Sequence, residues 1–210
     1  MTRALSLCGV ILAAGESTRM GRDKALLPWP PDAPASSAET LLSAAIAAFN
    51  PFSDVVIVVV GKNELNLAPV VYASGASLVR NPSPERGQFS SLQVALHEVL
   101  NRGRDAAMVT LVDRPPPRTA TLAALRAAFE SAVEQGKWAV VPEYQGRHGH
   151  PIVLGREMIE AFLRAPATGT AREIEHGNLE HVQYVPVDDP SVPMNLNTPQ
   201  DYAALRTPAQ

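Results

Sequence analysis

The chain has 210 residues, of which 46% are hydrophobic, and a formal net charge of -3. Its length suits one globular domain with a sizeable core, and its weak charge creates no field that favours nucleic acid or an anionic membrane as a partner. The single cysteine, Cys8, excludes an internal disulfide and a zinc site built from paired cysteines.

The apolar stretch at the N-terminus, residues 4–14, admits two interpretations. Because it follows Arg3, it could be a short signal peptide. Its strand-forming residues and its direct continuation into Gly15, Arg19 and Lys24 favour a buried strand that leads into a functional loop. No segment approaches the roughly 20 apolar residues needed to cross a bilayer. We therefore expect a soluble, cytoplasmic protein in which residues 1–210 form one domain.

Strand and helix patterns alternate along the chain. Continuous apolar runs predict buried strands, and apolar residues at helical spacing predict helices. In chain order we expect strand Leu5–Leu12, helix Thr40–Phe49, strands Val55–Val60 and Leu78–Arg80, helix Ser91–Leu100, strand Ala106–Val112, helix Thr119–Glu134, strands Trp138–Val141 and Ile152–Leu154, helix Gly155–Arg164, strand Val182–Val187 and helix Pro199–Leu205. This alternation predicts a single Rossmann-like three-layer α/β/α domain with a mostly parallel sheet.

A loop rich in small residues, Leu12–Lys24, follows the first strand. Ligands of α/β sheets bind beyond the carboxyl ends of strands, where this loop is expected to lie. Small residues let backbone N–H groups approach a polyphosphate, and Arg19 and Lys24 add positive charge. The loop has neither the Walker A nor the dinucleotide-binding glycine pattern. Taken alone, it fits equally well a turn with two solvated basic side chains.

Three later segments carry further polar groups. Asn81 and the segment Gly87–Leu92 supply an amide, hydroxyls and a helix N-terminus, although Ser90 alone could simply be an N-cap. Asp113 follows a predicted strand, where it could hold a divalent cation against phosphates or could cap a turn before prolines. The pair His148 and His150 could indicate a metal site, which is the weaker interpretation of that segment.

These segments together resemble one family. Leu12–Gly15 with Arg19, Met20, Gly21 and Lys24 resembles the L-A-A-G-x-S-x-R-M-G-x-x-K motif of the MobA-like nucleotidyltransferases, closest to the branch of molybdenum cofactor cytidylyltransferases. Three further segments are similar to the family's N-P…G-x-x-S-S-L, L-V-D-x-P and G-x-x-G-H-P-V segments: Asn81–Leu92, Leu111–Pro115 and Gly146–Ile152. The resemblance extends over nearly the whole chain.

The resemblance implies a fold like that of nucleotide-diphospho-sugar transferases and a specific reaction. An NMP group would pass from an NTP, with CTP favoured, to a phosphorylated acceptor of the molybdopterin type, and pyrophosphate would leave. It implies Mg²⁺, which Mn²⁺ can replace, and is compatible with contact to a molybdoenzyme or a cofactor-insertion protein. Two alternatives remain: a nucleotidyltransferase for a sugar phosphate or another phosphorylated small molecule, and a nucleotide-binding protein with impaired catalysis.

Carried over residue by residue, the resemblance assigns four sets of site residues. The catalytic set is Arg19, Lys24 and Asp113. The nucleotide-binding set is Leu12, Ala13, Ala14, Gly15, Ser17, Arg19, Met20, Gly21, Lys24, Asn81, Gly87, Ser90 and Ser91. The acceptor-side set is Arg147, His148, Gly149, His150 and Arg172. The metal set is Asp113, Asn197 and Asn195.

The chain departs from the family pattern at two places. Asn195–Asp201 is similar to the family's D-x-D-T-P-E-D, but amides replace both of the first two carboxylates. An amide oxygen can bind Mg²⁺ without adding charge, so the sequence predicts a weaker metal site. The segment Ala167–Arg172 lacks the acidic residue that cofactor cytidylyltransferases tend to have there.

Overall fold

An eight-stranded sheet runs through the computed structural model of the protein, which describes residues 5–15, 21, 23–34, 37–166 and 168–206. The strands follow the order β3-β2-β1-β4-β7-β5-β6, and β8 pairs with β5. Their bounds are β1 Leu7–Leu12, β2 Val55–Val60, β3 Ser77–Arg80, β4 Ala106–Leu111, β5 Ala139–Tyr144, β6 Arg147–His148, β7 Ile152–Gly155 and β8 Val182–Pro186.

The half of the sheet formed by β3, β2, β1 and β4 is entirely parallel. From β1 the chain proceeds to β2 and β3 on one side, and then returns to place β4 on the other side. The strand order therefore reverses between β1 and β4, which is the position where open α/β sheets bind their ligands. Beyond β4, strand β7 is antiparallel, while β8 restores a parallel pair with β5.

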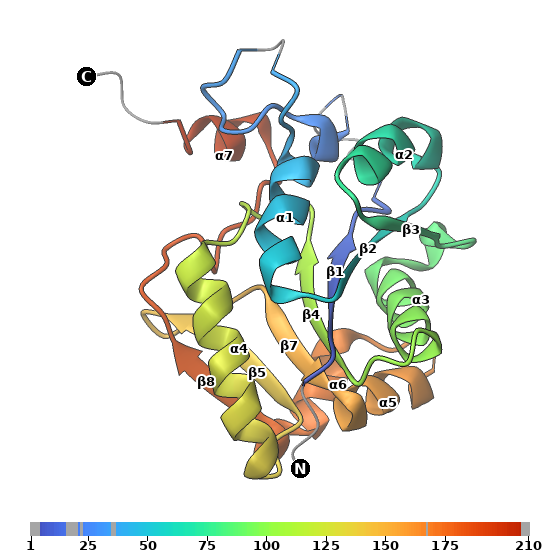
Figure 1. Ribbon diagram of the computed structural model, residues 1–210, viewed down its shortest axis with the longest axis vertical. Helices are drawn as coiled ribbons and strands as arrows, with labels where there is room; N and C mark the ends of the chain where they lie inside the picture. The colour runs from blue at the N-terminus through green and yellow to red at the C-terminus, as the bar shows by residue number, and fades with distance from the viewer. Residues whose placement is uncertain (1–4, 16–20, 22, 35–36, 167, 207–210) are drawn as a thin grey trace.

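Helices cover both faces of the sheet (Figure 1). Helices α1 (Leu41–Phe49), α2 (Glu64–Ala73) and α4 (Thr119–Glu134) contribute to one core cluster, and α3 (Gln88–Asn101) and α5 (Arg156–Arg164) contribute to the other. The short helix α6 (Ala171–Gly177) lies beside the second cluster, and α7 (Pro199–Ala203) is the last helix of the described chain. The predicted α/β/α architecture with a mostly parallel sheet is confirmed.

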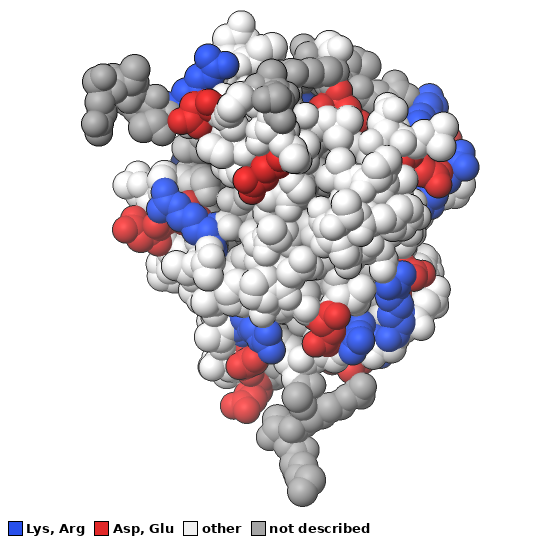
Figure 2. All heavy atoms as spheres, turned by 45° about the horizontal axis from the view of Figure 1, so that its top comes forward, with Lys and Arg blue, Asp and Glu red and all other residues white. Residues whose placement is uncertain are grey.

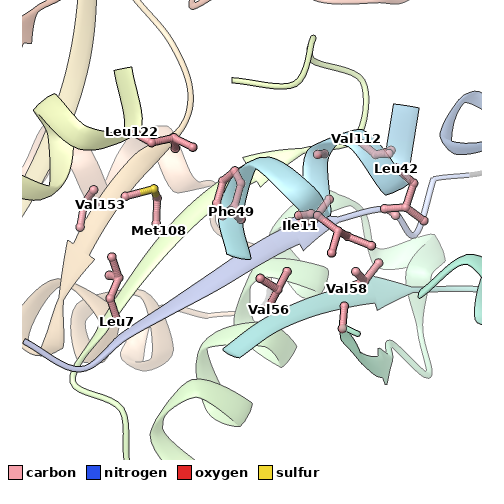
Figure 3. Close-up of a cluster of buried hydrophobic side chains, with 14 of the residues drawn as sticks. Leu7, Ile11, Leu42, Phe49, Val56, Val58, Met108, Val112, Leu122 and Val153 are labelled. Atoms are coloured by element: carbon pink, nitrogen blue, oxygen red, sulfur yellow. The ribbon is translucent and has the colours of Figure 1, made fainter. Parts of the chain in front are cut away.

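Side chains of the central strands alternate between the two faces. In β2, Val56 and Val58 face the first cluster, and Ile57 and Val59 face the second. Figure 3 shows the first cluster, where side chains of β1, β2 and β4 meet those of α1 and α4. Both faces are buried, which explains why these strands are uninterrupted apolar runs. Cys8 lies in the second cluster, and burial raises the pKa of its thiol to about 12.

The structure differs from the predicted elements mainly by two additional helices, α2 and α6. Helix α2 contains Pro69 and buries only Leu67 and Val71, so its apolar pattern is weak. Helix α6 buries no residue completely and begins with a capping box between Thr170 and Glu173. Among the described helices, none is both long and apolar enough to span a membrane.

Phe129 provides a test of the core beneath α4. Its side chain is 1% exposed within the first cluster, and Phe129→Ala removes apolar contacts and leaves a cavity. We expect the free energy of unfolding to fall by about 3–5 kcal/mol, measured by urea denaturation. Val133→Ala is the matched control, because Val133 lies on the same helix and is 50% exposed. Its effect should stay within about 0.5 kcal/mol; equal effects would contradict this packing.

Candidate functional site

A cavity of about 320 Å³ lies where the strand order reverses. Leu12 and Leu111 are register partners at the carboxyl ends of β1 and β4, and both line it. The other lining residues are Ala14, Gly15, Lys24, Pro84, Gly87, Gln88, Ser91, Val112, Asp113 and Asn197. On the face that Figure 2 brings forward, charged side chains of both signs are interspersed. The residues that line the cavity come from four segments that are far apart in the sequence: 12–24, 84–91, 111–113 and Asn197.

Lys24 reaches the cavity from a short 3-10 helix, Lys24–Leu26. The side chain of Asp23 caps this helix by accepting a hydrogen bond from the Ala25 backbone N–H at 3.1 Å. Lys24 is only 8% exposed. A buried ammonium group is costly unless oxygens surround it, so this lysine has a defined position and is not a solvated surface charge.

Asn63 joins the two ends of the loop Leu12–Lys24. Its amide nitrogen donates to the Ala13 carbonyl at 2.9 Å and to Asp23 Oδ2 at 2.7 Å. Its oxygen accepts from the Gly61 N–H at 3.0 Å. Asn63 lies just after β2, the strand that pairs with β1. Through Asn63, the end of β2 therefore holds Asp23, the residue that caps the 3-10 helix of Lys24. Asn63 was not predicted as a site residue, because Ala13 and Asp23 are 50 and 40 positions away in the chain.

The segment around the start of α3 separates into residues that line the cavity and residues that support them. Asn81 is 2% exposed and donates to the hydroxyls of Ser90 and Ser91, both at 2.9 Å. Ser90 is also buried and donates to the Gly87 carbonyl at 2.7 Å. Asn81 and Ser90 therefore hold the turn, while Gly87 and Ser91 border the cavity. Gly87 has φ +91°, a conformation that favours glycine.

Asp113 and Asn197 meet at the same ammonium group. Lys24 Nζ lies 3.7 Å from Asp113 Oδ2 and 3.4 Å from Asn197 Oδ1. The Leu196 N–H donates to the Asp113 carbonyl at 2.7 Å, which brings the late segment against the end of β4. Three of the residues predicted for chemistry or metal binding thus share one location, although residues 24 and 197 are 173 positions apart.

Asp113 Oδ2 and Asn197 Oδ1 could both bind a divalent cation whose other ligands are water and substrate oxygens. Asp113 Oδ1 is buried and has no hydrogen-bond partner in the described part of the chain. No group of three His, Cys, Asp or Glu side chains that could hold a metal occurs among the residues that the structure describes. Mg²⁺ is commonly bound by one or two protein groups together with water and substrate phosphates. One carboxylate and one amide fit this mode.

Of the predicted acceptor-side residues, Arg147 alone lines one of two further hollows beside the cavity. Arg147 and Asn195 border a hollow of about 580 Å³, which shares Asn197 with the first cavity. A second hollow, of about 440 Å³, shares Gly87 and Gln88 with that cavity and is bordered by Thr168–Ala171. The exposed Arg172 follows this border on α6 without lining either hollow. Asn195, predicted as a metal ligand, is exposed and lines the first of these hollows, apart from Asp113.

His148 and His150 have different environments. His148 is exposed, and its Nε2 lies 3.0 Å from Glu143 Oε2. Its ring stacks on the ring of Tyr184, with 3.9 Å between the ring centroids. His150 has a buried Nδ1, and burial, aided by the charge of Arg114, lowers the pKa of its ring to about 3 from 6.5. His150 is therefore neutral at neutral pH and brings no positive charge to a phosphate.

The segment 189–197 is fixed to the end of β4 by several contacts. Arg114 Nη1 donates to the carbonyls of Val192 at 3.2 Å and Met194 at 3.0 Å. Gly149 approaches so closely that a Cβ there would lie 1.9 Å from the Val192 oxygen. Only glycine permits this approach, so the glycine of the G-H-P segment supports the position of Asn197.

The remaining residues of the predicted nucleotide-binding set differ in their positions. Ser17, Arg19 and Met20 lie outside the described residues. The buried Ala13 donates its N–H to the Val59 carbonyl, and Gly21, with φ +67°, lines none of the three hollows described above. Pro84, Gln88, Leu111 and Val112 border the cavity although sequence analysis did not select them. Their neighbours in the family-like segments were the available signal.

Asp189 anchors the segment that carries Asn197. Its carboxylate is 1% exposed, accepts from Thr121 Oγ1 at 2.7 Å and Ser191 Oγ at 2.6 Å, and lies 3.4 Å from Arg118 Nε. Burial raises the pKa of Asp189, but the hydrogen bonds from Ser191 and Thr121 and the Arg118 charge outweigh this and lower it.

Because the pKa of Asp189 is lower in the folded protein, its carboxylate stabilises the fold above the ordinary value of 3.8 and less as pH falls through the folded value. Asp189→Asn should lower the free energy of unfolding by about 1–3 kcal/mol at pH 7, because a neutral amide loses the charge opposite Arg118 and accepts the hydrogen bonds of Thr121 and Ser191 less strongly. Urea titrations at several pH values should show this difference shrinking below pH 3.8. The exposed Asp188→Asn is the control; a pH-independent loss in Asp189→Asn would contradict the assignment.

Comparison with known proteins gives one consistent result. Molybdenum cofactor cytidylyltransferase of Escherichia coli (strain K12) is 26% identical over 200 residues, covering 94% of each chain. "Probable molybdenum cofactor guanylyltransferase" of Mycobacterium avium (strain 104) is 28% identical over 206 residues, covering 98% of each. The crystal structure of Rv0371c from Mycobacterium tuberculosis H37Rv has a TM-score of 0.77, 29% identity and 98% coverage of each chain. A manganese complex of Rv0371c has a TM-score of 0.73 at 26% identity, covering 95% of this chain and 97% of that one.

The family comparison covers most of the sheet and most of the residues that line the cavity, but not Asn197. The model of the family described as "MobA-like NTP transferase domain" matches residues 9–183. This match includes the loop that carries Lys24, the start of α3 and Asp113 at the end of β4. The chain belongs to the MobA-like NTP transferase domain family and is a nucleotidyltransferase of that type.

Proposed function

We propose that the protein transfers an NMP group from an NTP, with CTP favoured, to a phosphorylated acceptor of the molybdopterin type. The observation that carries this proposal is the convergence of Lys24, Asp113 and Asn197 on one cavity at the reversal of strand order. Two relatives support the acceptor class, because both are named for transfer to the molybdenum cofactor. One is named a cytidylyltransferase and the other a probable guanylyltransferase, so the choice of CTP rests on the L-A-A-G start of the loop motif and on the G-x-x-S-S-L segment.

The proposed reaction needs alignment and charge neutralisation more than proton transfer. An oxygen of the acceptor phosphate forms a bond to the α-phosphorus, the bond from that phosphorus to the bridging oxygen breaks, and the electron pair leaves with pyrophosphate. The attacking phosphate is already an anion, so no general base is required. Lys24 neutralises the triphosphate from the cavity wall, and Arg19 of the same loop is assigned the same task.

Asp113 and Asn197 are the residues proposed to hold Mg²⁺, which Mn²⁺ can replace. A divalent cation held there supplies charge against the phosphate oxygens. A solved structure of Rv0371c contains manganese, which supports a metal-dependent reaction. The turn between β3 and α3 is proposed to surround the base of the nucleotide, because Gly87, Gln88 and Ser91 border the cavity there.

The acceptor is proposed to occupy the hollow bordered by Arg147. This hollow adjoins the nucleotide cavity through Asn197, one of the two residues assigned to the metal. It also presents a guanidinium group and the amide of Asn195, which suit a phosphate and a polar ring system. The hollow bordered by Thr168–Ala171 adjoins the cavity away from Asn197, and Arg172 does not line it.

A pyrophosphate-release assay tests the reaction. The protein is incubated with Mg²⁺, molybdopterin and, in turn, CTP, GTP, ATP or UTP. We expect release that requires the acceptor and is fastest with CTP. Asp113→Asn should lower kcat by about 10²–10³-fold, because the only carboxylate assigned to the metal is lost.

The matched control is Asp54→Asn, because Asp54 directly precedes β2 at the amino end of the parallel strands, whereas the cavity lies at their carboxyl ends. It should retain the wild-type kcat. Nucleotide binding without pyrophosphate release under every condition would replace this proposal with the non-catalytic alternative. Release with a sugar phosphate in place of molybdopterin would replace only the acceptor class.

A pair of arginine variants tests the acceptor hollow. Arg147→Ala should raise the KM for the acceptor by about tenfold or more, because one charged contact to a phosphate is lost. Its KM for the NTP should stay unchanged. Arg172→Ala removes another exposed arginine near the other hollow and should leave both KM values unchanged. The opposite pattern would move the acceptor to the hollow beside α6.

A further inference from the structure

The predicted metal ligands and Lys24 share the same oxygens. Asp113 Oδ2 and Asn197 Oδ1 lie 3.7 and 3.4 Å from Lys24 Nζ. Lys24 is 8% exposed and extends from a capped helix, so its ammonium depends on these oxygens for part of its solvation. The ammonium is thus the cation that faces the two ligands in the structure.

The charges of this group are nearly balanced without a metal. Asp113 carries one negative charge and Lys24 one positive charge, while the amide of Asn197 contributes an oxygen and no charge. A divalent cation at the same oxygens would be attracted by one carboxylate and repelled by a nearby ammonium. The remainder of the described site offers no further carboxylate cluster to offset that repulsion.

We propose that Lys24 and the divalent cation are alternative partners of Asp113 and Asn197, so that the metal binds tightly only together with a triphosphate. The triphosphate offers Lys24 new anionic oxygens and offers the cation additional ligands. This inference rests on the proposed metal role of Asp113 and Asn197. It predicts that the nucleotide, and not the protein alone, recruits the metal.

Mn²⁺ binding to the full-length protein without nucleotide tests the inference directly. Free Mn²⁺ is measured by electron paramagnetic resonance for wild type and for Lys24→Met and Lys24→Gln. Both variants should bind Mn²⁺ at least about tenfold more tightly than wild type, because the competing charge is removed. The double variant Lys24→Met with Asp113→Asn should lose this gain, which locates the ion at Asp113.

Lys137→Met is the matched control, because the Lys137 ammonium donates to the Glu180 carbonyl at 2.8 Å beside the amino end of β5, at the end of the sheet opposite to the carboxyl end of β4 and Asp113. It should bind Mn²⁺ like wild type. Circular dichroism shows which variants are folded, and either position-24 variant suffices. Adding the non-reacting analogue α,β-methylene-CTP should tighten Mn²⁺ binding to wild type by more than tenfold.

Equal Mn²⁺ affinity of wild type and both position-24 variants, or no measurable binding by any of them, overturns the inference. So does a gain that persists in the double variant. These outcomes are separate from the transfer assay: a protein that releases pyrophosphate normally but shows equal affinities overturns this inference alone. A protein that transfers nothing but shows the gain retains the inference and loses the proposed reaction.

Discussion

The parallel pairing of β1 with β4 is the constraint on which the site depends. The pairing brings Leu12 and Leu111 level with one another, so the segments that follow both strands start side by side. The chain continues from β1 towards β2 on one side, and from β4 through α4 towards β5 on the other side. Because these segments diverge, a crevice opens between them. Lys24 and Asp113 can meet there only because the two strands end together.

The strands were predictable because a strand that is buried on both faces is an uninterrupted run of apolar residues in the sequence. The β-branched run Val55–Val60 and the helix Thr119–Glu134 have the predicted bounds. Helix α2 was missed because Pro69 interrupts a pattern with two buried residues. Helix α6 leaves no apolar stripe, since none of its residues is fully buried. Its Thr170 and Glu173 have capping-box spacing, so that end was visible in the sequence.

The site shows a similar division between groups that face the ligand space and groups that hold them. Lys24, Asp113 and Asn197 were predicted from motif-like segments, and they lie together. The contacts of Asn63 with Asp23 and of Arg114 with the Met194 carbonyl were not predictable, because they join residues 40 and 80 positions apart. Such partners depend on the strand order, which one sequence does not encode locally. The resemblance identified the motifs, and the topology explains their meeting.

The amide of Asn197 makes the net charge around Lys24 less negative than a carboxylate at this position would. A carboxylate there would face Asp113 across Lys24, giving two negative charges for one positive charge in a space proposed for a triphosphate. The amide retains the oxygen and removes the second charge, so the Lys24–Asp113 pair is nearly neutral. A neutral pair repels a tetraanionic ligand less than an acidic one does, although it attracts a divalent cation less strongly. With the roles proposed for Asp113 and Asn197, the site therefore holds a metal less strongly and accepts a triphosphate more readily, which agrees with a metal that binds tightly only together with the nucleotide.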